Sequence, residues 1–452
     1  MKIRLVRLVL PLCLLVLTAC TTRKPVPTRE GTLPTYMNMV KDLNTFPQDL
    51  TVYAQRIGNN RNLLSAEEQT QQDARFNRMF FGPWDMTRAT IKRREVQALF
   101  GRGPRGYIQG SRRWSETDWN AMKSNADLKR YPSRATPGIT LRHTNLRELP
   151  TSLPSFSEPT PDPVANPFDN FQYSALPMGT PLFIAHTSRD KLWHFVETPL
   201  AGGWVRADDV GVVDDAFERR YRNGHYAALI RDNVNVRTSR GNQPGRVHIG
   251  AVFPVVGREG DNLRILAPVG GAEGRAVTDT ALLADADAVI KPLPLLPGLV
   301  ARIGNEMLGQ RYGWGGMFEN RDCSATTRDL FTPFGIWLPR NSAAQARAGR
   351  LENLRDLSPQ ARERTILDTG TPFLSLIWMK GHIGLYIGKY KGQAAMFHNV
   401  WGVRVLDEKG EDGRHVIGRC VVTSLQPGRE LPNLAEGMTL RDRLLGVSTM
   451  PK

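Results

Sequence analysis

The sequence predicts an α+β protein built from several units, and three observations lead to this fold class. Helical patterns fill residues 36–137, short strand-like runs separated by turn residues fill residues 138–290, and helices mix with strands in residues 295–432. A chain of 452 residues can form roughly three or four domains of ordinary size. We therefore expect a helical N-terminal region, two small β-barrels and a C-terminal α+β domain.

The N-terminus carries the pattern of an export signal. Three cations precede an apolar run over residues 8–17, which ends on Leu17-Thr18-Ala19-Cys20. A positive flank, a short apolar core and small residues at its end are typical of a secretory signal, and the core is too short to span a bilayer. We predict a signal peptide over residues 1–19.

The end of this signal resembles the lipobox of bacterial lipoproteins. The resemblance implies that Cys20 becomes the lipid-modified first residue of the mature chain, although an ordinary apolar cysteine is the alternative. Thr21, which stands where inner-membrane lipoproteins carry Asp, suits the outer membrane of a Gram-negative cell and a domain facing the periplasm. Residues 20–35, with three prolines, are then expected to be a flexible tether.

The net charge of the chain limits the classes of partner that it is expected to bind. The chain has a formal net charge of +16 and stays strongly basic without its signal. Because an exported protein does not meet genomic DNA, we expect anionic lipid or wall polymer as partner and no nucleic acid, with an ordinary solvated basic surface as the alternative. No His-Glu-x-x-His motif or paired His/Asp cluster occurs, so we expect no metal and no cofactor, and we expect a monomer.

Residues 36–137 are predicted to pack rather than to catalyse. Ser65-Ala66-Glu67-Glu68 has the form of a capping box, and apolar residues follow at helical spacing. Three other helical stretches are expected, over residues 40–57, 87–100 and 115–128.

Residues 138–215 and 224–290 are each predicted to form a small β-barrel. Short apolar runs alternate with turn residues in both, and the two share a 13-position spacing from Gly179 to Leu192 and from Gly250 to Leu263. The segments at 145–156, 202–210 and 232–241 resemble bacterial SH3-type domains. That resemblance implies binding of wall peptides, with a structural spacer as the alternative.

A cysteine at a predicted helix start is the main chemical signal. Asp322 is a good N-cap, which places Cys323 in the first turn of a helix, after a glycine-rich turn. Free N–H groups and the helix dipole there favour a thiolate, the reactive form of the side chain. A buried core cysteine is the alternative interpretation.

A histidine on a predicted strand is the second signal. In residues 381–388 alternation places His382, Gly384 and Tyr386 on one face, and we expect that face to line a cleft in which the glycines leave room for a substrate. A thiol nucleophile needs an imidazole to accept its proton. His398 could orient that imidazole as a third group, or be an ordinary core histidine.

Residues 295–430 resemble the NlpC-type peptidases, papain-like enzymes that cut peptide stems of peptidoglycan. The motifs that carry the resemblance are Tyr312-Gly-Trp-Gly-Gly316, Asp322-Cys323-Ser324, Leu338-Pro339-Arg340-Asn341-Ser342 with Gln345, Gly381–Gly388, and His398. The resemblance implies Cys323 as nucleophile, His382 as base and His398 as the residue that orients it. It also implies substrate contacts by Tyr312, Asp322 and Ser324, with Asp322 receiving the free amine of L-alanine.

The resemblance implies a peptidoglycan hydrolase that cleaves the γ-D-glutamyl-diamino acid bond, with diaminopimelate as the diamino acid. SH3-bearing relatives further imply stems with a free L-alanine end. Ala325 stands where the family often has glycine, and residues 371–380 replace an acidic turn, which leaves the substrate preference open. The alternative function is an inactive wall-binding lipoprotein that acts through its SH3-like domains. Cys420 is expected to be a small apolar residue in the last strand.

Overall fold

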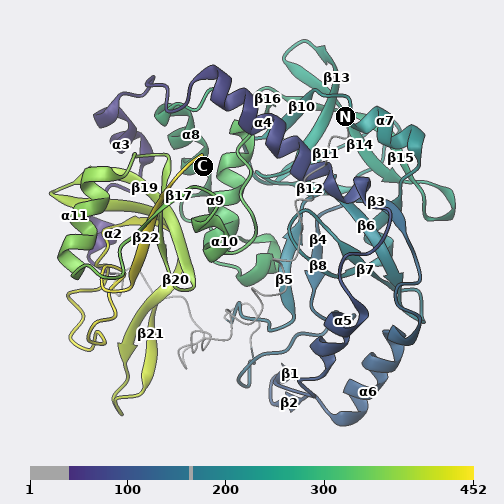
Figure 1. The fold of residues 1–452 in the computed structure, drawn as a ribbon, viewed down its shortest axis with the longest axis horizontal. Coiled ribbons are helices and arrows are strands. Elements are labelled where there is room, and N and C mark those ends of the chain that lie inside the picture. The colour runs from purple at the N-terminus through teal and green to yellow at the C-terminus, as the bar shows by residue number, and fades with distance from the viewer. Residues whose placement is uncertain (1–39, 162–165, 452) are drawn as a thin grey trace, which may run out of the picture.

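The computed structural model describes residues 40–161 and 166–451 (Figure 1). The predicted signal peptide, Cys20 and the tether lie outside the described residues. Among the described helices, none is long and apolar enough to cross a membrane.

The N-terminal region is mainly helical, as predicted, with one short hairpin of β1 (Tyr107–Gln109) and β2 (Arg112–Arg113). Its helices are α2 (Asp42–Thr45), α3 (Leu50–Ile57), α4 (Ala66–Phe81), α5 (Arg93–Phe100) and α6 (Glu116–Asn125). The capping box is confirmed, because Ser65 N donates to Glu68 Oε2 (2.8 Å) and Glu68 N donates to Ser65 Oγ (3.2 Å). Two predicted boundaries are wrong: Pro47 follows the end of α2, so residues 40–57 form two helices, and the helix expected from residue 87 begins only at Arg93.

These helices pack mainly against the rest of the chain, although α5 and α6 also contact each other through Phe100 and Trp119. Helix α3 contributes Leu50 and Tyr53 to the core of the C-terminal domain. Helices α5 and α6 join the core of the first barrel, whereas α4 covers the second barrel and reaches Trp337. The N-terminal helices therefore cover parts of the other three units, and α4 runs from the side of α8 toward the barrels (Figure 1).

The first barrel is a seven-stranded antiparallel sheet in the order β5-β4-β8-β7-β6-β3-β9. Its strands are β3 (Thr136–Thr140), β4 (Thr144–Arg147), β5 (Gln172–Leu176), β6 (Pro181–Thr187), β7 (Trp193–Glu197), β8 (Gly202–Arg206) and β9 (Val210–Val212). Trp204, which is fully buried, packs with Phe195 in its core.

The second barrel combines a five-stranded sheet, in the order β15-β14-β13-β10-β16, with the hairpin β11–β12. Its strands are β10 (Tyr226–Leu229), β11 (Val234–Val236), β12 (Gly245–Val247), β13 (Val252–Glu259), β14 (Asn262–Gly270), β15 (Ala276–Ala284) and β16 (Ala288–Lys291). The spacing shared with the first barrel has a structural counterpart. Gly179 and Gly250 both have positive φ (82° and 105°), and each lies two residues before a strand.

The C-terminal domain has one six-stranded antiparallel sheet in the order β17-β22-β18-β19-β20-β21. Its strands are β17 (Arg350–Asn353), β18 (Ser375–Met379), β19 (His382–Tyr390), β20 (Gln393–Leu406), β21 (Asp412–Thr423) and β22 (Leu444–Thr449). Helices α8 (Pro297–Met307), α9 (Cys323–Phe331), α10 (Ser342–Ala346) and α11 (Pro359–Thr369) belong to the same part of the chain.

Strand β22 inserts between β17 and β18, so the sheet includes residues beyond position 432. Cys420 consequently lies in β21 and not in the last strand, which corrects that expectation. Its small apolar role is confirmed, because Cys420 is 1 % exposed within the main core and both Cys323 and Cys420 are free thiols.

The C-terminal domain approaches the first barrel closely at Gly316, and a substitution there can test this contact. Its φ is +89°, and an added Cβ would lie 2.4 Å from Ala175 Cβ. We expect Gly316→Ala to cost about 2–5 kcal/mol, through the left-handed backbone and overpacking. Gly309→Ala is the control, since Gly309 has a similar φ (+77°) in open space and should lose only about 1 kcal/mol. Thermal unfolding of both variants compares them, and equal midpoints would contradict the close approach.

Candidate active site

The start of helix α9 is built as the sequence predicts. Asp322 is the N-cap, and its Oδ1 accepts from Ala325 N (2.9 Å). Cys323 is therefore the first residue of the helix, where backbone N–H groups lack intrahelical partners. Its side chain lies in the main core, and the residue is only 7 % exposed.

The thiol of Cys323 is neutral in this environment. Burial and the negative charge of Asp322 raise its pKa to about 12, against smaller opposing effects from the backbone of Ile383, the charge of Arg340 and the backbone of Ser324. Desolvation of the thiolate thus outweighs the stabilisation that we expected from the helix start. A base must remove the proton before the sulfur can attack.

His382 begins strand β19 beside this thiol. The backbone of the next residue, Ile383, makes a hydrogen bond to Cys323, which places the start of the helix against the start of β19. His382 Nε2 lies 2.7 Å from His398 Nδ1 on the neighbouring strand β20. The three residues singled out in the sequence, Cys323, His382 and His398, are therefore brought together.

One face of β19 differs from its prediction. Ile383, Leu385 and Ile387 are buried in the core as expected. The opposite face is also covered, because Tyr386 is 3 % exposed in a second apolar cluster. Gly384 leaves room for His398 rather than for a substrate, since an added Cβ would lie 2.7 Å from His398 Cβ.

A chain of hydrogen bonds fixes which nitrogen of His382 is protonated. The backbone oxygen of Ser424 can only accept, so the Thr423 hydroxyl donates to it (2.7 Å). Thr423 Oγ1 must then accept from His398 Nε2–H (3.0 Å). Burial lowers the pKa of both imidazoles, that of His382 to about 3, so both are neutral. His398 Nδ1 consequently accepts from His382 Nε2–H, and His382 Nδ1 keeps a free lone pair.

Sequence reasoning missed Thr423 because nothing near it in the chain marks it. It follows His398 by 25 positions and lies at the end of β21. Only the pairing of β20 with β21, in which His398 faces Val421, brings its hydroxyl to the imidazole.

Arg340 is a second residue that was not assigned a role. It forms an ion pair with Asp322, and its Nη1 lies 3.2 Å from Asp322 Oδ1 and donates to Ser324 Oγ. Its Nε donates to Ser174 Oγ of the first barrel (3.1 Å). Arg340 therefore ties the residues flanking Cys323 to that barrel.

Asp322 has no oxygen left free for an amine. Besides Arg340, Oδ1 accepts from Ala325 N and Ser324 Oγ, and Oδ2 accepts from Gly315 N (3.2 Å). Arg340 and these donors hold the pKa of the buried carboxyl below its usual value against the opposing effect of burial. The geometry favours a structural role for Asp322, and its contact with a substrate amine stays a prediction.

Tyr312 belongs to an aromatic cluster at the same junction. Its ring centroid lies 5.8 Å from that of Phe168 and 6.1 Å from that of Trp401, and Trp314 packs against the cluster. Burial raises the pKa of the Tyr312 hydroxyl, and negative charge on Cys323, when that thiol is deprotonated, and on Asp322 raises it further. Tyr312 therefore lies near enough to Cys323 for a thiolate there to affect its hydroxyl. The residue is 8 % exposed.

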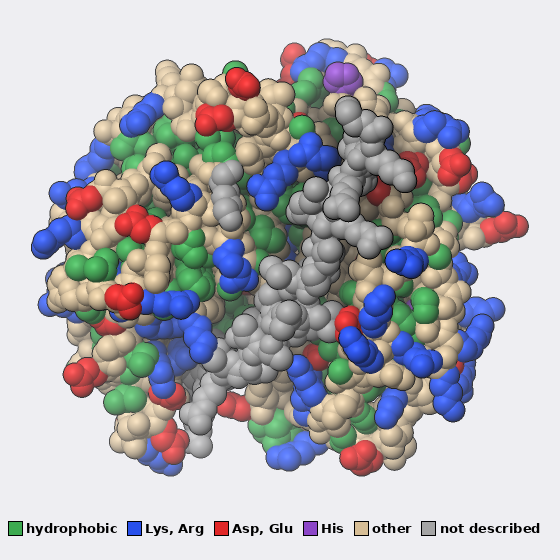
Figure 2. Space-filling model, in the orientation of Figure 1, with side chains coloured by type: hydrophobic (Ala, Val, Ile, Leu, Met, Phe, Trp, Pro, Cys, Tyr) green, Lys and Arg blue, Asp and Glu red, His purple; other side chains and the backbone are tan. Residues whose placement is uncertain are grey.

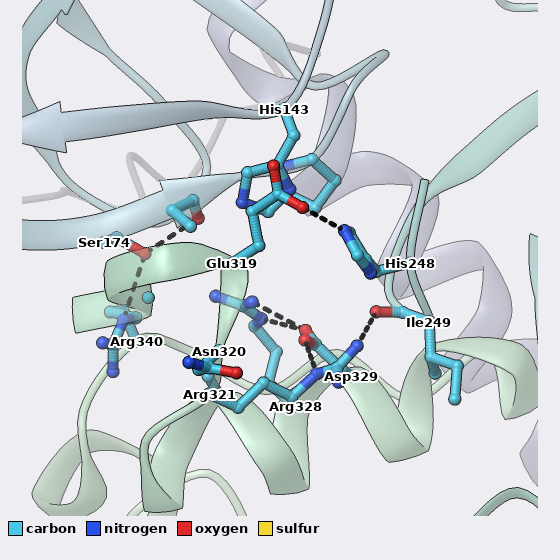
Figure 3. A pocket seen from close by; sticks show the side chains of 14 residues that line it. His143, Ser174, His248, Ile249, Glu319, Asn320, Arg321, Arg328, Asp329 and Arg340 are labelled. Atoms are coloured by element: carbon cyan, nitrogen blue, oxygen red, sulfur yellow. Dashed lines mark hydrogen bonds and ion pairs between the residues drawn. The ribbon is translucent and has the colours of Figure 1, made fainter. Parts of the chain in front are cut away.

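On the side of α9 that faces the barrels, a small cavity forms where both barrels meet the C-terminal domain (Figure 3). Arg321 reaches across it, binding Asp329 of α9 (2.7 Å) and Ile249 O of the second barrel (2.9 Å). Glu319 is 3.1 Å from His248 Nε2. Ala325, which replaces the glycine common in the resembled family, lines this cavity rather than the side of α9 that carries the thiol.

Four family models match the chain. The N-terminal stabilising domain of NLPC_P60 matches residues 8–131, an SH3 domain of the SH3b1 type residues 154–206, an SH3 domain of the SH3b2 type residues 214–259, and the NlpC/P60 family residues 309–411. The C-terminal domain belongs to the NlpC/P60 family. It carries Cys323, His382 and His398 within the matched residues.

A solved structure shares the fold of most of this chain. An NlpC/P60 endopeptidase from Photobacterium damselae subsp. piscicida is 24 % identical, with a TM-score of 0.78 over 90 % of this chain and 99 % of its own. An NlpC/P60 family protein from Bacillus cereus ATCC 10987 is 16 % identical over 69 % of this chain and 99 % of its own, with a TM-score of 0.46. A comparison with curated protein sequences gave no match.

The raised pKa of Cys323 predicts its reactivity. The rate of alkylation by iodoacetamide should rise about tenfold per pH unit from pH 6 to pH 9, because the thiolate fraction does so below the pKa. Mass spectrometry of the Cys323 peptide measures this rate, with Cys323→Ala reporting any reaction at Cys420. A rate that is already constant between pH 5 and pH 8 would show instead a thiolate–imidazolium pair.

Proposed function

We propose that this protein is an exported peptidoglycan endopeptidase with a Cys323-His382-His398 centre. The observation that carries the proposal is the hydrogen-bond chain from Ser424 to His382, because it leaves His382 Nδ1 as a proton acceptor beside a buried thiol. The match of residues 309–411, which include these three residues, to the NlpC/P60 family supports it.

The proposed reaction starts from the neutral pair. As Cys323 Sγ attacks the carbonyl carbon, its proton moves to His382 Nδ1, and backbone N–H groups at the start of α9 bind the oxyanion. His382 then protonates the departing amine, the C–N bond breaks, and an acyl-enzyme remains. Water, deprotonated by His382, releases the acid and restores the thiol. His398 is a positioning residue, because it holds His382 without touching the reacting atoms.

The proposed substrate is a peptidoglycan stem cut between γ-D-glutamate and the diamino acid, with a free L-alanine end. The first barrel lies against the thiol-bearing domain on the side of Tyr312 and Arg340, where it would close the site around a short peptide end. Tyr312 and Ser324 are proposed to line that side. The SH3 domains support contact with wall peptides.

The proposed location is the cell envelope. Peptidoglycan lies outside the inner membrane, which agrees with the signal pattern of residues 1–19. We propose that lipidated Cys20 tethers the protein to the outer membrane, with its domains facing the periplasm. The proposed boundaries of the signal, tether and domains are those given by the sequence, with β22 added to the C-terminal domain.

The direct test uses the soluble mature protein and L-Ala-γ-D-Glu-diaminopimelate. Mass spectrometry should find free diaminopimelate with the wild type and none with Cys323→Ala, because the variant lacks the nucleophile. Release of diaminopimelate by both proteins would rule out Cys323 as the nucleophile. Release by neither, even from larger murein fragments, would favour the wall-binding alternative, which a pull-down of Cys323→Ala on murein then examines.

The role of the hydrogen-bond chain has its own test in Thr423→Val, which removes the hydroxyl and keeps the shape. Without its acceptor, His398 can shift its proton to Nδ1 and leave His382 with the wrong tautomer. We expect kcat to fall roughly 10- to 100-fold, part of the contribution of a general base. Thr369→Val, at an exposed position of α11, is the control. An unchanged kcat in Thr423→Val would contradict the tautomer assignment.

A further inference from the structure

The surface formed by the start of α5, the end of α6 and the turn between β6 and β7 is rich in exposed cations. Three of them stand at the start of α5, two end the 3₁₀-helix η3 (Leu128–Arg130) that follows α6, and two lie in the β6–β7 turn. Figure 2 shows Lys and Arg side chains over the part of the molecule where α5 and α6 lie, at the lower right. We call this surface the basic face, and its cations are Lys92, Arg93, Arg94, Lys129, Arg130, Arg189 and Lys191.

The elements of the basic face touch one another. Arg93 Nη1 donates to Lys129 O (3.4 Å), which joins α5 to η3. Arg189 N donates to Asn125 O (2.8 Å) and Asn125 Nδ2 donates to Asp190 Oδ2 (2.8 Å), which joins the β6–β7 turn to the end of α6. Helices α5 and α6 also share one apolar core with the first barrel. The cations are therefore held on a single surface of fixed shape.

Acidic side chains offset only part of this charge. Asp127 lies 3.5 Å from Arg130 and 3.7 Å from Arg189. Three other acids contact these elements, but they accept from backbone or neutral side-chain groups; they are Glu95, Asp190 and the buried Glu197. Arg206 and Asp208, next to the turn, pair with each other (3.1 Å) and add no net charge.

Seven cations against four acids leave the basic face positive. Within the part of the chain that the structure describes, four of these cations form no ion pair, namely Lys92, Arg94, Lys129 and Lys191. Near the opposite end of α6, Glu116 and Asp118 are accompanied by Arg112 and Arg113, and Arg112 pairs with Asp118 (3.2 Å). No acidic surface therefore adjoins the basic face along α6.

An exposed leucine stands among these cations. Leu192 is 48 % exposed, and it follows Lys191, whose positive φ (61°) marks the tight turn before β7. The backbone of Leu192 is fixed on both sides, because its N donates to Asp190 Oδ1 (3.0 Å) and its O accepts from Ala207 N (2.9 Å). An apolar side chain held in a rigid turn beside Lys and Arg suits the boundary between lipid headgroups and acyl chains.

We propose that the basic face binds anionic lipid headgroups of the membrane, with Leu192 inserted among them. Lys and Arg near an anionic leaflet each favour binding, and the attraction fades within a Debye length, so only cations presented on one surface act together. The proposal rests on the proposed location in the cell envelope, where lipidated Cys20 would keep the face close to lipid and raise its effective concentration. It does not depend on the peptidase reaction.

Lipid fits this face better than wall polymer does. Wall glycan and stem peptides carry negative charge as well, but they offer no apolar interior for an exposed leucine. The strands of the C-terminal domain lie on the side of the molecule opposite α5 and α6 (Figure 1). A protein bound through the basic face would therefore hold the thiol-bearing domain away from the lipid surface and toward the wall.

The test is co-sedimentation of the soluble mature protein with vesicles of phosphatidylcholine alone or with about one-third phosphatidylglycerol. The protein should bind the anionic vesicles much more tightly, and about 1 M salt should abolish binding because the Debye length falls to ~3 Å. Lys129→Gln combined with Lys191→Gln should weaken binding roughly 20- to 30-fold, about fivefold for each cation. Leu192→Ser should weaken it about threefold or more, by loss of buried apolar surface.

The control combines Lys389→Gln and Lys409→Gln, exposed cations of two C-terminal hairpins, which gives the same change in net charge. Its binding should stay within about twofold of the wild type. Equal wild-type binding to both kinds of vesicle, or equal losses in the two double variants, would overturn the inference. Loss of binding to murein sacculi, with vesicle binding kept, in the Lys129 and Lys191 variant would assign the face to wall polymer instead.

Stem-peptide cleavage separates this inference from the proposed function. Both double variants should release diaminopimelate at the rate of the wild type, because neither pair of lysines belongs to the Cys323 centre. Circular dichroism establishes that each variant is folded. Failure to bind anionic vesicles would overturn the inference and leave the peptidase intact, whereas failure to cleave any stem would overturn the proposed function and leave lipid binding measurable.

Discussion

The buried guanidinium of Arg321 is the interaction on which the arrangement around the thiol depends. It binds Asp232 of the second barrel (2.7 Å) and Asp329 of helix α9 (2.7 Å), while its backbone oxygen accepts from Asn399 of β20 (2.9 Å). Arg321 immediately precedes the N-cap of α9, and Asn399 follows His398. One residue thus connects a barrel and the helix that carries Cys323 through its side chain, and the strand that carries His398 through its backbone. Removing one partner would leave a buried charge uncompensated, which makes the junction cooperative.

A second contact, between Arg340 and Asp322, joins the first barrel to the same helix start. The two barrels therefore hold α9 from two directions, and the N-terminal helices supply apolar cover to all three units. Because these cores are shared, the domains are parts of one packed body rather than modules on linkers. The barrels are consequently positioned to shape a substrate site as well as to bind wall polymer.

Desolvation dominates the electrostatics of the proposed centre. Burial raises the pKa of Cys323 and lowers that of His382, so the resting pair is neutral and proton transfer accompanies attack. Neutral imidazoles have one donor and one acceptor nitrogen each, so the Thr423 hydroxyl decides which nitrogen of His382 is protonated. After burial, the charge of Arg443 further lowers the pKa of His382 and so opposes its protonation.

The sequence by itself determined the local features, because they depend on neighbours in the chain. The capping box at Ser65 and Glu68, the N-cap at Asp322, the alternation along β19 and the chemical types of Cys323, His382 and His398 all follow from patterns of a few residues. Only the tertiary structure decided that both oxygens of Asp322 are occupied, that Gly384 makes room for His398, that Thr423 orients the imidazoles and that the thiol is neutral. Those properties arise from burial and from partners 14 to 25 positions away, and strand pairing and domain packing alone bring these groups together.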